Sequence, residues 1–267
     1  MTVREWVREG EIRGQIMFSF KTLSESFAAV SKQVLLNELQ RLKKKGVIYS
    51  PYKSFYVVLP SQYVLRRSVP PFYFMEELMR YLGKNYYFNT LTAAMIHGAA
   101  HQSPQKSFVT TTLPKLNTSA SSQANIQWFY RKEIPHNLVR EKAGETGSIK
   151  YSSAELTAVE LVQYEHNLGG LSNIATVLAE LIETTDFAFA SEGTFAVCND
   201  TAIQRLGYIV ENILGDERQA EVIYHEWTRC CPNPHYHLLS AHATNPIAHR
   251  DERWKIDVNT SIEIDDL

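Results

Sequence analysis

The sequence predicts an α+β fold in which an N-terminal winged helix-turn-helix precedes a larger mixed α/β domain. Three observations predict it. Helical spacing gives way to a pair of strands within the first 60 residues, the net charge changes sign near residue 67, and Pro70-Pro71 follow at the junction. A chain of 267 residues is long for one ordinary domain and comfortable for two. We therefore expect domains over residues 1–68 and 69–267.

The composition indicates a globular protein. Apolar residues make up 44% of the chain, which is enough for two cores and too many for intrinsic disorder. No apolar run approaches the roughly 18 residues that a membrane-spanning helix needs, and the charged N-terminus lacks the apolar stretch of a secretory signal. Three cysteines, two of them adjacent at Cys230 and Cys231, do not make a disulfide framework. We therefore expect a cytoplasmic protein in a reducing setting.

The first domain has the element order of a winged helix. Ser31 is a suitable N-cap for its longest helix, and Gly46 stands where a glycine commonly ends such a helix. Gly10 and Gly14 are expected to bracket a break after the first helix. The expected elements, in order, are a helix over 1–9, a strand over 16–18, helices over 19–27 and 31–45, and a hairpin with strands 47–49 and 55–59 around a turn at 50–54.

The second domain is expected to mix helices and strands after a linker over Leu65–Pro71. The small polar residues 117–123 predict an exposed loop. The expected helices cover residues 74–82, 91–98, 154–164, 171–182 and 201–214, and the expected strands cover 108–113, 126–130, 148–151 and 256–258.

The charge of the chain is unevenly distributed. Residues 1–67 hold 12 Lys and Arg against 5 Asp and Glu, a net charge of +7, whereas the remaining residues carry −9. A strongly positive segment beside a negative one is typical of a protein whose positive part meets a polyanion. Since the positive segment is also the predicted winged helix, we expect the 1–68 domain to bind DNA.

The helix over 31–45 has two chemically different faces. Leu35, Leu39 and Leu42 fall on one narrow face, which we expect to pack on the domain. Amide side chains on the opposite face can bond adenine through two atoms, and Arg and Lys can reach guanine or phosphate. The predicted DNA-binding residues, which include the hairpin tip and two linker arginines, are Lys32, Gln33, Asn37, Gln40, Arg41, Lys43, Lys44, Tyr52, Lys53, Ser54, Arg66 and Arg67. An ordinary amphipathic helix with a solvated polar face is the alternative.

Four stretches of the sequence resemble a known family. They are "LLNELQRLKKKGVIYSPYKSFYVVLP" (35–60), "PPFYFMEELMRYLGKNYYFNTLTAAMIHGAAHQSPQ" (70–105) and "GSIKYSSAELTAVELV" (147–162), followed near the end by "WKIDVN" (254–259). Their order and spacing resemble the AbiEi-type antitoxins of type IV toxin–antitoxin (abortive infection) systems. The resemblance implies a repressor that binds inverted repeats in its own promoter. It also implies a C-terminal domain that counters a nucleotidyltransferase-like toxin without requiring a stable complex with it.

An enzyme is the second hypothesis. His97 and His101 are four residues apart, which is metal-ligand spacing on a helix, but Gly98 threatens the helix between them. Cysteine and histidine gather at Cys230, Cys231, His235 and His237 without the spacing of a zinc module, and Gly147-Ser148 lack the carboxylates of a nucleotidyltransferase. No phosphate-binding or nucleophile motif is present in the sequence. We therefore expect no catalytic activity, metal or cofactor. A metal- or nucleotide-dependent enzyme would instead need a concave site joining His97 or His101 with Cys230, Cys231 or His237.

Overall fold

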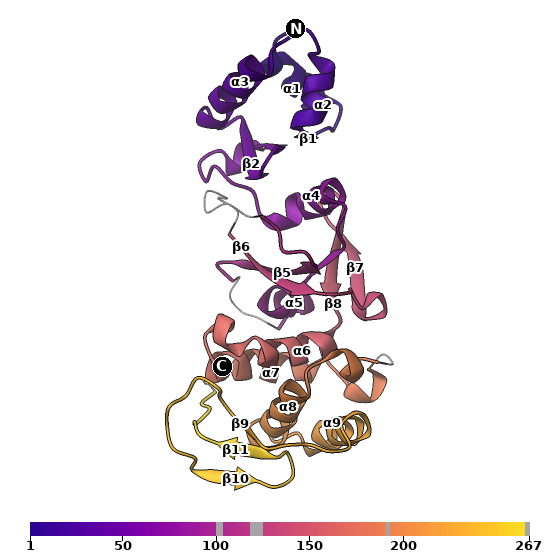
Figure 1. Ribbon diagram of the computed structural model, residues 1–267, viewed down its shortest axis with the longest axis vertical. Helices are drawn as coiled ribbons and strands as arrows, with labels where there is room; N and C mark the ends of the chain where they lie inside the picture. The colour runs from indigo at the N-terminus through magenta and orange to yellow at the C-terminus, as the bar shows by residue number, and fades with distance from the viewer. Residues whose placement is uncertain (100–103, 118–124, 191–192, 265–267) are drawn as a thin grey trace. The chain divides into compact units, whose positions relative to one another are not determined.

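The computed structural model describes residues 1–99, 104–117, 125–190 and 193–264 (Figure 1). His101 and most of the predicted loop over 117–123 lie outside the described residues. The chain divides into two compact units: Met1–Tyr86, Thr111–Ile134 and Lys142–Ile149 form the first unit, and Tyr87–Thr110, Pro135–Glu141 and Lys150–Leu267 form the second. The predicted mixed α+β class is confirmed. None of the described helices has the length and apolar character needed to cross a membrane.

The N-terminal part of the first unit has the element order expected of a winged helix. The elements are α1 (Val3–Ile12), β1 (Met17–Ser19), α2 (Phe20–Ser26), α3 (Lys32–Lys44), β2 (Ile48–Tyr52) and β3 (Phe55–Val58). The three strands form an antiparallel sheet in the order β1-β3-β2. Thr2, Ser19 and Ser31 each cap the helix that follows with their hydroxyl oxygen, which accepts a bond from a first-turn N–H group.

Two local predictions in this part were wrong. Gly10 lies inside α1 and does not end it, so the break comes at Gly14, whose φ is +79°. The hairpin turn is shorter than predicted because β2 continues through Pro51 to Tyr52, which pairs with Phe55. Proline is tolerated there since β2 is an edge strand whose pairing shifts between Tyr49 and Tyr52. The turn is therefore the two residues Lys53 and Ser54.

The sheet β1-β3-β2 is buried on both faces. One face packs on the helices, in a cluster of Val3, Val7, Phe18, Leu23, Leu35, Leu39, Leu42, Ile48, Tyr56 and Val58. The other face contributes to a second cluster of Tyr49, Phe55, Val57, Leu59, Val69, Phe74 and Leu78. Because side chains alternate along a strand, burial of every residue of β3 requires both clusters. Hydrophobic packing therefore continues from the hairpin across the predicted linker to α4 (Met75–Leu82).

A five-stranded sheet has the order β6-β5-β4-β8-β7. Its strands are β4 (Tyr86–Phe88), β5 (Ser107–Thr112), β6 (Ile126–Arg131), β7 (Val139–Ala143) and β8 (Ser148–Ser152). The inner strands β4 and β8 are parallel, with Phe88 opposite Tyr151. In the second unit, Tyr87 on β4 donates its hydroxyl proton to the fully buried Glu160 at 2.5 Å. This bond partly offsets the cost of burying a carboxyl group.

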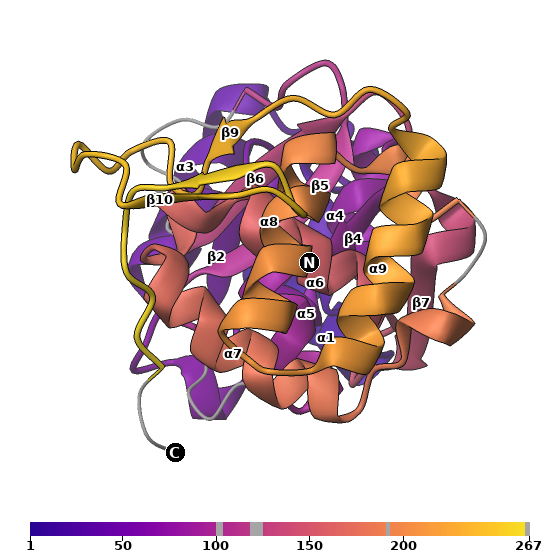
Figure 2. The same ribbon diagram turned by 90° about the horizontal axis from the view of Figure 1, so that it is seen from below.

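Helices fill most of the second unit. They are α5 (Thr90–His97), α6 (Ala154–Gln163), α7 (Leu171–Glu183), α8 (Asp200–Asn212) and α9 (Glu217–Cys230). Helix α6 contacts α5, α7 and α8, which explains why every residue from Leu156 to Val162 is buried. Figure 2 shows α8 and α9 side by side. A small sheet of the order β10-β11-β9 is built from β9 (His237–Leu238), β10 (His249–Asp251) and β11 (Ile256–Val258).

Gly207 on α8 is required by the packing of Trp254, which is fully buried. A Cβ atom at Gly207 would lie 2.0 Å from Trp254 Cζ3, so the indole ring or the helix would have to move. We expect Gly207→Ala to lower the free energy of unfolding by about 1–3 kcal/mol, although alanine is the better helix former. Urea denaturation measures this change. In a Trp254→Leu background the same substitution should cost much less, and an equal cost in both backgrounds would contradict the steric explanation.

The second hydrophobic cluster predicts the relative stability of two N-terminal fragments. A fragment of residues 1–68 should fold, but it lacks Phe74 and Leu78, which cover the hairpin. A fragment of residues 1–86 should melt at least about 10 °C higher, since burial of each such side chain stabilises by about 1.5–3 kcal/mol. Circular dichroism melting curves measure the difference, and Phe74→Ala in the longer fragment is the control. Equal melting temperatures would show that residues 69–86 add nothing to the core of the fragment.

Candidate nucleic-acid interface

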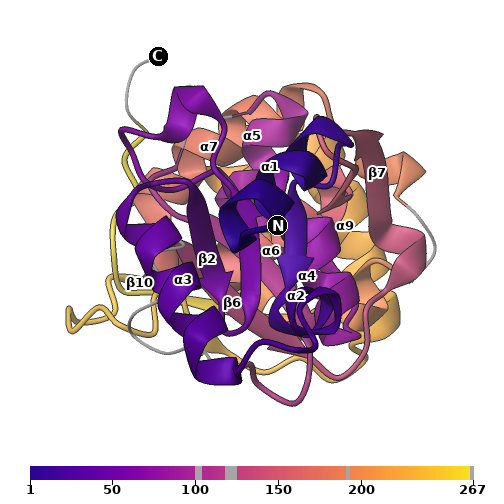
Figure 3. The same ribbon diagram turned by 90° about the horizontal axis from the view of Figure 1, so that it is seen from above.

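Helix α3 presents its polar face to solvent. Leu35, Leu39 and Leu42 are between 1% and 3% exposed, so the opposite side of the helix is directed outward. Figure 3 shows α3 beside β2, which it contacts. The predicted residues of α3 are all exposed: Lys32, Gln33, Asn37, Gln40, Arg41, Lys43 and Lys44. The periodicity of the sequence thus correctly divided this helix into a packed face and a solvent-exposed face.

Two amide side chains in the N-terminal half of α3 are bonded to each other. Gln33 Nε2 donates to Asn37 Oδ1 at 3.1 Å, one helical turn further on. Between them, Val34 keeps 50% of its surface exposed. Both amides were predicted to face DNA but Val34 was not, although an apolar residue on the polar side of an amphipathic helix is visible in the sequence.

The C-terminal half of α3 carries the cations. Lys43 and Lys44 are exposed in the last turn, where positive charge also interacts favourably with the helix dipole. Arg41 is different, because it forms an ion pair with Glu38 on the preceding turn. Glu38 was not among the predicted residues, yet it is the acidic residue that competes for Arg41. The cation at Arg41 is therefore partly neutralised within the helix.

The hairpin tip exposes fewer of its predicted DNA-binding side chains than the sequence suggested. Lys53 is exposed, but Tyr52 is half-buried and packs against the second hydrophobic cluster. Ser54 has a φ of +62°, and its carbonyl oxygen accepts a bond from Phe20 N at 2.8 Å. A two-residue turn projects little beyond the sheet, so Lys53 is the residue of this tip that is best placed to reach a phosphate.

The segment with the two predicted arginines passes the C-terminal end of α3. A Cβ atom at Gly46, which follows α3, would lie 3.7 Å from Val64 Cγ1. Arg66 and Arg67 follow two and three residues later, and both are exposed. The segment that carries these two arginines therefore begins close to Gly46, which follows the lysines that end α3.

The described histidines and cysteines of the enzyme hypothesis lie on different elements of the second unit. His97 is the last residue of α5, and its Nε2 lies 2.9 Å from Ser152 O. Gly98 ends that helix with a φ of +87°. Cys230 is the last residue of α9, and burial together with Arg205 lowers the pKa of His237. Across the described residues, no three His, Cys, Asp or Glu side chains are grouped to hold a metal ion.

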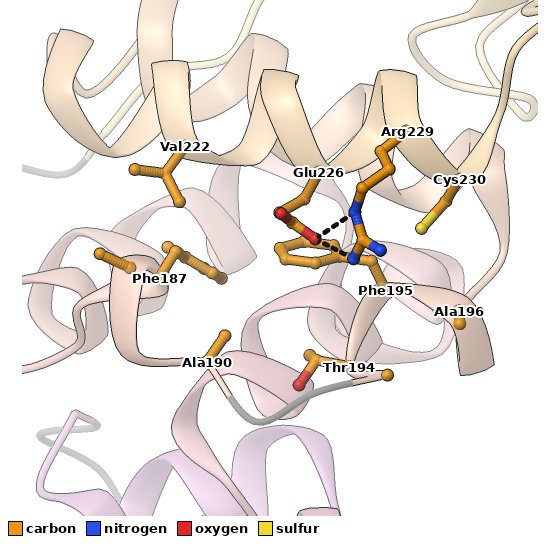
Figure 4. A pocket seen from close by; sticks show the side chains of 11 residues that line it. Phe187, Ala190, Thr194, Phe195, Ala196, Val222, Glu226, Arg229 and Cys230 are labelled. Carbon is orange, nitrogen blue, oxygen red and sulfur yellow. Dashed lines mark hydrogen bonds and ion pairs between the residues drawn. The ribbon is translucent and has the colours of Figure 1, made fainter.

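A pocket of about 440 Å³ lies between α9 and the segment that precedes α8 (Figure 4). Figure 4 shows Glu226 and Arg229 entering it from α9, opposite Phe187 and Phe195. Arg229 donates to Glu226 and lowers the pKa of that carboxyl group, so it stays ionised near neutral pH. Cys230 lines this pocket, but His97 and His237 do not.

Comparison with known proteins finds a family to which part of the chain is similar. Residues 87–212 match the family model described as the AbiEi antitoxin C-terminal domain. This part of the chain is therefore similar to the antitoxin domains of toxin–antitoxin systems, and the resemblance to the AbiEi-type antitoxins is confirmed over these residues. A toxin is the functional partner that this family suggests.

A solved structure supports the fold over most of the chain. The structure described as "Crystal structure of RV2827C protein from Mycobacterium tuberculosis" superposes with a TM-score of 0.62 at 12% sequence identity. The match covers 91% of this chain and 86% of that chain. At this identity the similarity concerns the fold alone. No match was found among curated proteins.

Proposed function

We propose that this protein is a DNA-binding autorepressor and antitoxin of a type IV toxin–antitoxin (abortive infection) system. In this proposal, residues 1–68 form a winged helix that binds double-stranded DNA at inverted repeats in the protein's own promoter. The observation that carries it is the exposed face of α3, where neutral amides and cations lie opposite three buried leucines. The net charge of +7 over residues 1–67 supports the same assignment.

The antitoxin part of the proposal rests on the family match of residues 87–212. The partner would be a nucleotidyltransferase-like toxin in the cytoplasm, countered without a stable complex. In this proposal the protein is not an enzyme and uses no cofactor. The enzyme hypothesis needs His97 or His101 near Cys230, Cys231 or His237, and among the described residues the pocket that includes Cys230 is lined by neither His97 nor His237.

The DNA-binding proposal predicts that two positions on α3 behave differently. Asn37→Ala should cost about 1–3 kcal/mol on the preferred duplex and little on a scrambled duplex, because a neutral amide reads bases and releases few counterions. Lys44→Ala should weaken binding to both duplexes. It should also reduce the salt slope, d log K/d log[salt], by about 0.9 in magnitude, because one phosphate is no longer neutralised. Fluorescence anisotropy titrations of the full chain at several salt concentrations measure both quantities.

The controls are Gln33→Ala, which should follow Asn37→Ala, and Lys43→Ala and Lys53→Ala, which should follow Lys44→Ala. Thermal melting of each variant checks that the fold persists, as expected for exposed side chains. If Asn37→Ala and Lys44→Ala act alike on both duplexes, the proposed orientation of α3 on DNA is wrong. If neither changes binding, the winged helix is not the DNA-binding part.

The ion pair between Glu38 and Arg41 predicts a gain of affinity. Glu38→Gln removes a negative charge from the interface and releases the guanidinium group, so affinity for any duplex should rise about three-fold at low salt. Glu25→Gln on α2 is the matched control, since Glu25 also pairs with a cation on its own helix, Lys21 at 3.9 Å. An equal gain for both variants would mean that only net charge matters, and no gain would place Glu38 away from DNA.

A further inference from the structure

The bonded amides of α3 present a fixed pattern to solvent. Gln33 Nε2 donates to Asn37 Oδ1, which leaves Gln33 Oε1 as an acceptor and Asn37 Nδ2 as a donor. Among the described residues, no hydrogen-bond partner is found for Gln33 Oε1 or Asn37 Nδ2. Exchanging the roles of the two amides would still leave one carbonyl oxygen and one amino group outward. The pair therefore offers one unbonded carbonyl oxygen and one unbonded amino group, and each amide restricts the rotation of the other.

This pattern matches one base edge in the major groove. Adenine presents an acceptor at N7 beside a donor at N6, so each atom meets its complement on the amide pair. Guanine presents two acceptors, N7 and O6, and the free carbonyl oxygen of the pair would face one of them without a proton between. The amide pair therefore favours adenine over guanine. A single amide can already bond adenine through these two atoms, and the bond between the two side chains adds to this preference because it restricts their rotation.

Val34 adds a third element to the same surface. Its side chain is 50% exposed and lies one residue from Gln33 and three from Asn37, hence on an adjoining part of the helix face. Exposed valine on a polar face gains nothing from water, but it can bury the C5 methyl group of thymine. The thymine methyl lies in the same groove as the adenine N7 and N6 atoms of its base pair. Gln33, Val34 and Asn37 thus complement both halves of an A·T pair or of two neighbouring pairs.

We propose that the N-terminal half of α3 reads A·T base pairs in the major groove, with the Gln33–Asn37 amide pair on adenine and Val34 on the thymine methyl group. This inference rests on the proposed function and specifies the sequence that the interface selects. The lysines at the other end of α3 hold the phosphate backbone and do not discriminate among bases.

The test begins with the full chain and a library of duplexes with a randomised central segment. Duplexes retained after several rounds of selection should share A·T pairs, spaced as inverted repeats if the protein binds as a symmetric pair. Single-atom changes in the selected duplex then test each contact. Replacing the critical adenine by 7-deazaadenine removes the N7 acceptor, and replacing the critical thymine by uracil removes only the methyl group.

We expect 7-deazaadenine to weaken binding of the unaltered chain about ten-fold and uracil to weaken it about four-fold. Asn37→Ala should be insensitive to 7-deazaadenine but still sensitive to uracil, whereas Val34→Ala should show the reverse. Gln40→Ala, which alters an exposed amide in the other half of α3, should remain sensitive to both replacements. These paired effects separate a base contact from a general weakening of affinity.

Three results would overturn the inference. Selected duplexes without common A·T pairs would show that α3 reads another base, and sensitivity to the replacements that persists in Asn37→Ala and Val34→Ala would assign the contacts to other residues. In both cases the proposed DNA-binding function would stand. Failure of the chain to retain any duplex from the library at low salt would overturn the proposed function, and the recognition of A·T pairs with it.

Discussion

The packing of Leu35, Leu39 and Leu42 on the three-stranded sheet is the interaction on which the proposed interface depends. An α-helix has 3.6 residues per turn, so burying one narrow face fixes the direction of every other side chain. The sheet beneath is itself held from both faces, which is why all four residues of β3 are buried. Rotation of α3 would expose leucines on one side and bury cations on the other. The direction in which Gln33 and Asn37 point is therefore set by the core.

The two halves of α3 support the proposal to different degrees. Lys43 and Lys44 stabilise the C-terminal end of any helix through the helix dipole, so their presence has an explanation that needs no DNA. The side chains in the N-terminal half of α3 are not explained by the helix dipole in the same way. Exposed Val34 contributes nothing to the core, and an amide pair at the helix surface stabilises by only a few tenths of a kcal/mol. These residues are therefore the more informative part of the face.

Sequence patterns predicted what depends on local spacing. Ser31 as the cap of α3, the leucine face and the mixed α+β class follow from periodicity and cap chemistry, and the structure has all three. The sequence did not predict the short turn after Pro51, because whether proline fits a strand depends on that strand lying at a sheet edge. It also missed α9, whose apolar positions Ala220, Ile223 and Trp227 have helical spacing among many polar residues. Pairings such as Glu38 with Arg41 depend on rotamers, and spacing alone does not choose between them.

The distribution of charge bears on how such a protein would meet DNA. Residues 1–67 carry +7 and the rest of the chain carries −9, so a phosphate backbone attracts the first part and repels the second. Repulsion of residues 68–267 disfavours encounters in which that part of the chain meets DNA. The orientation in which the protein meets DNA is therefore biased before any base is read. Attraction alone would hold the protein on any sequence, because phosphate contacts carry no sequence information. A regulator therefore needs, in addition to its cations, neutral side chains that contact bases. In the proposed interface Gln33, Val34 and Asn37 provide them at the N-terminal end of α3.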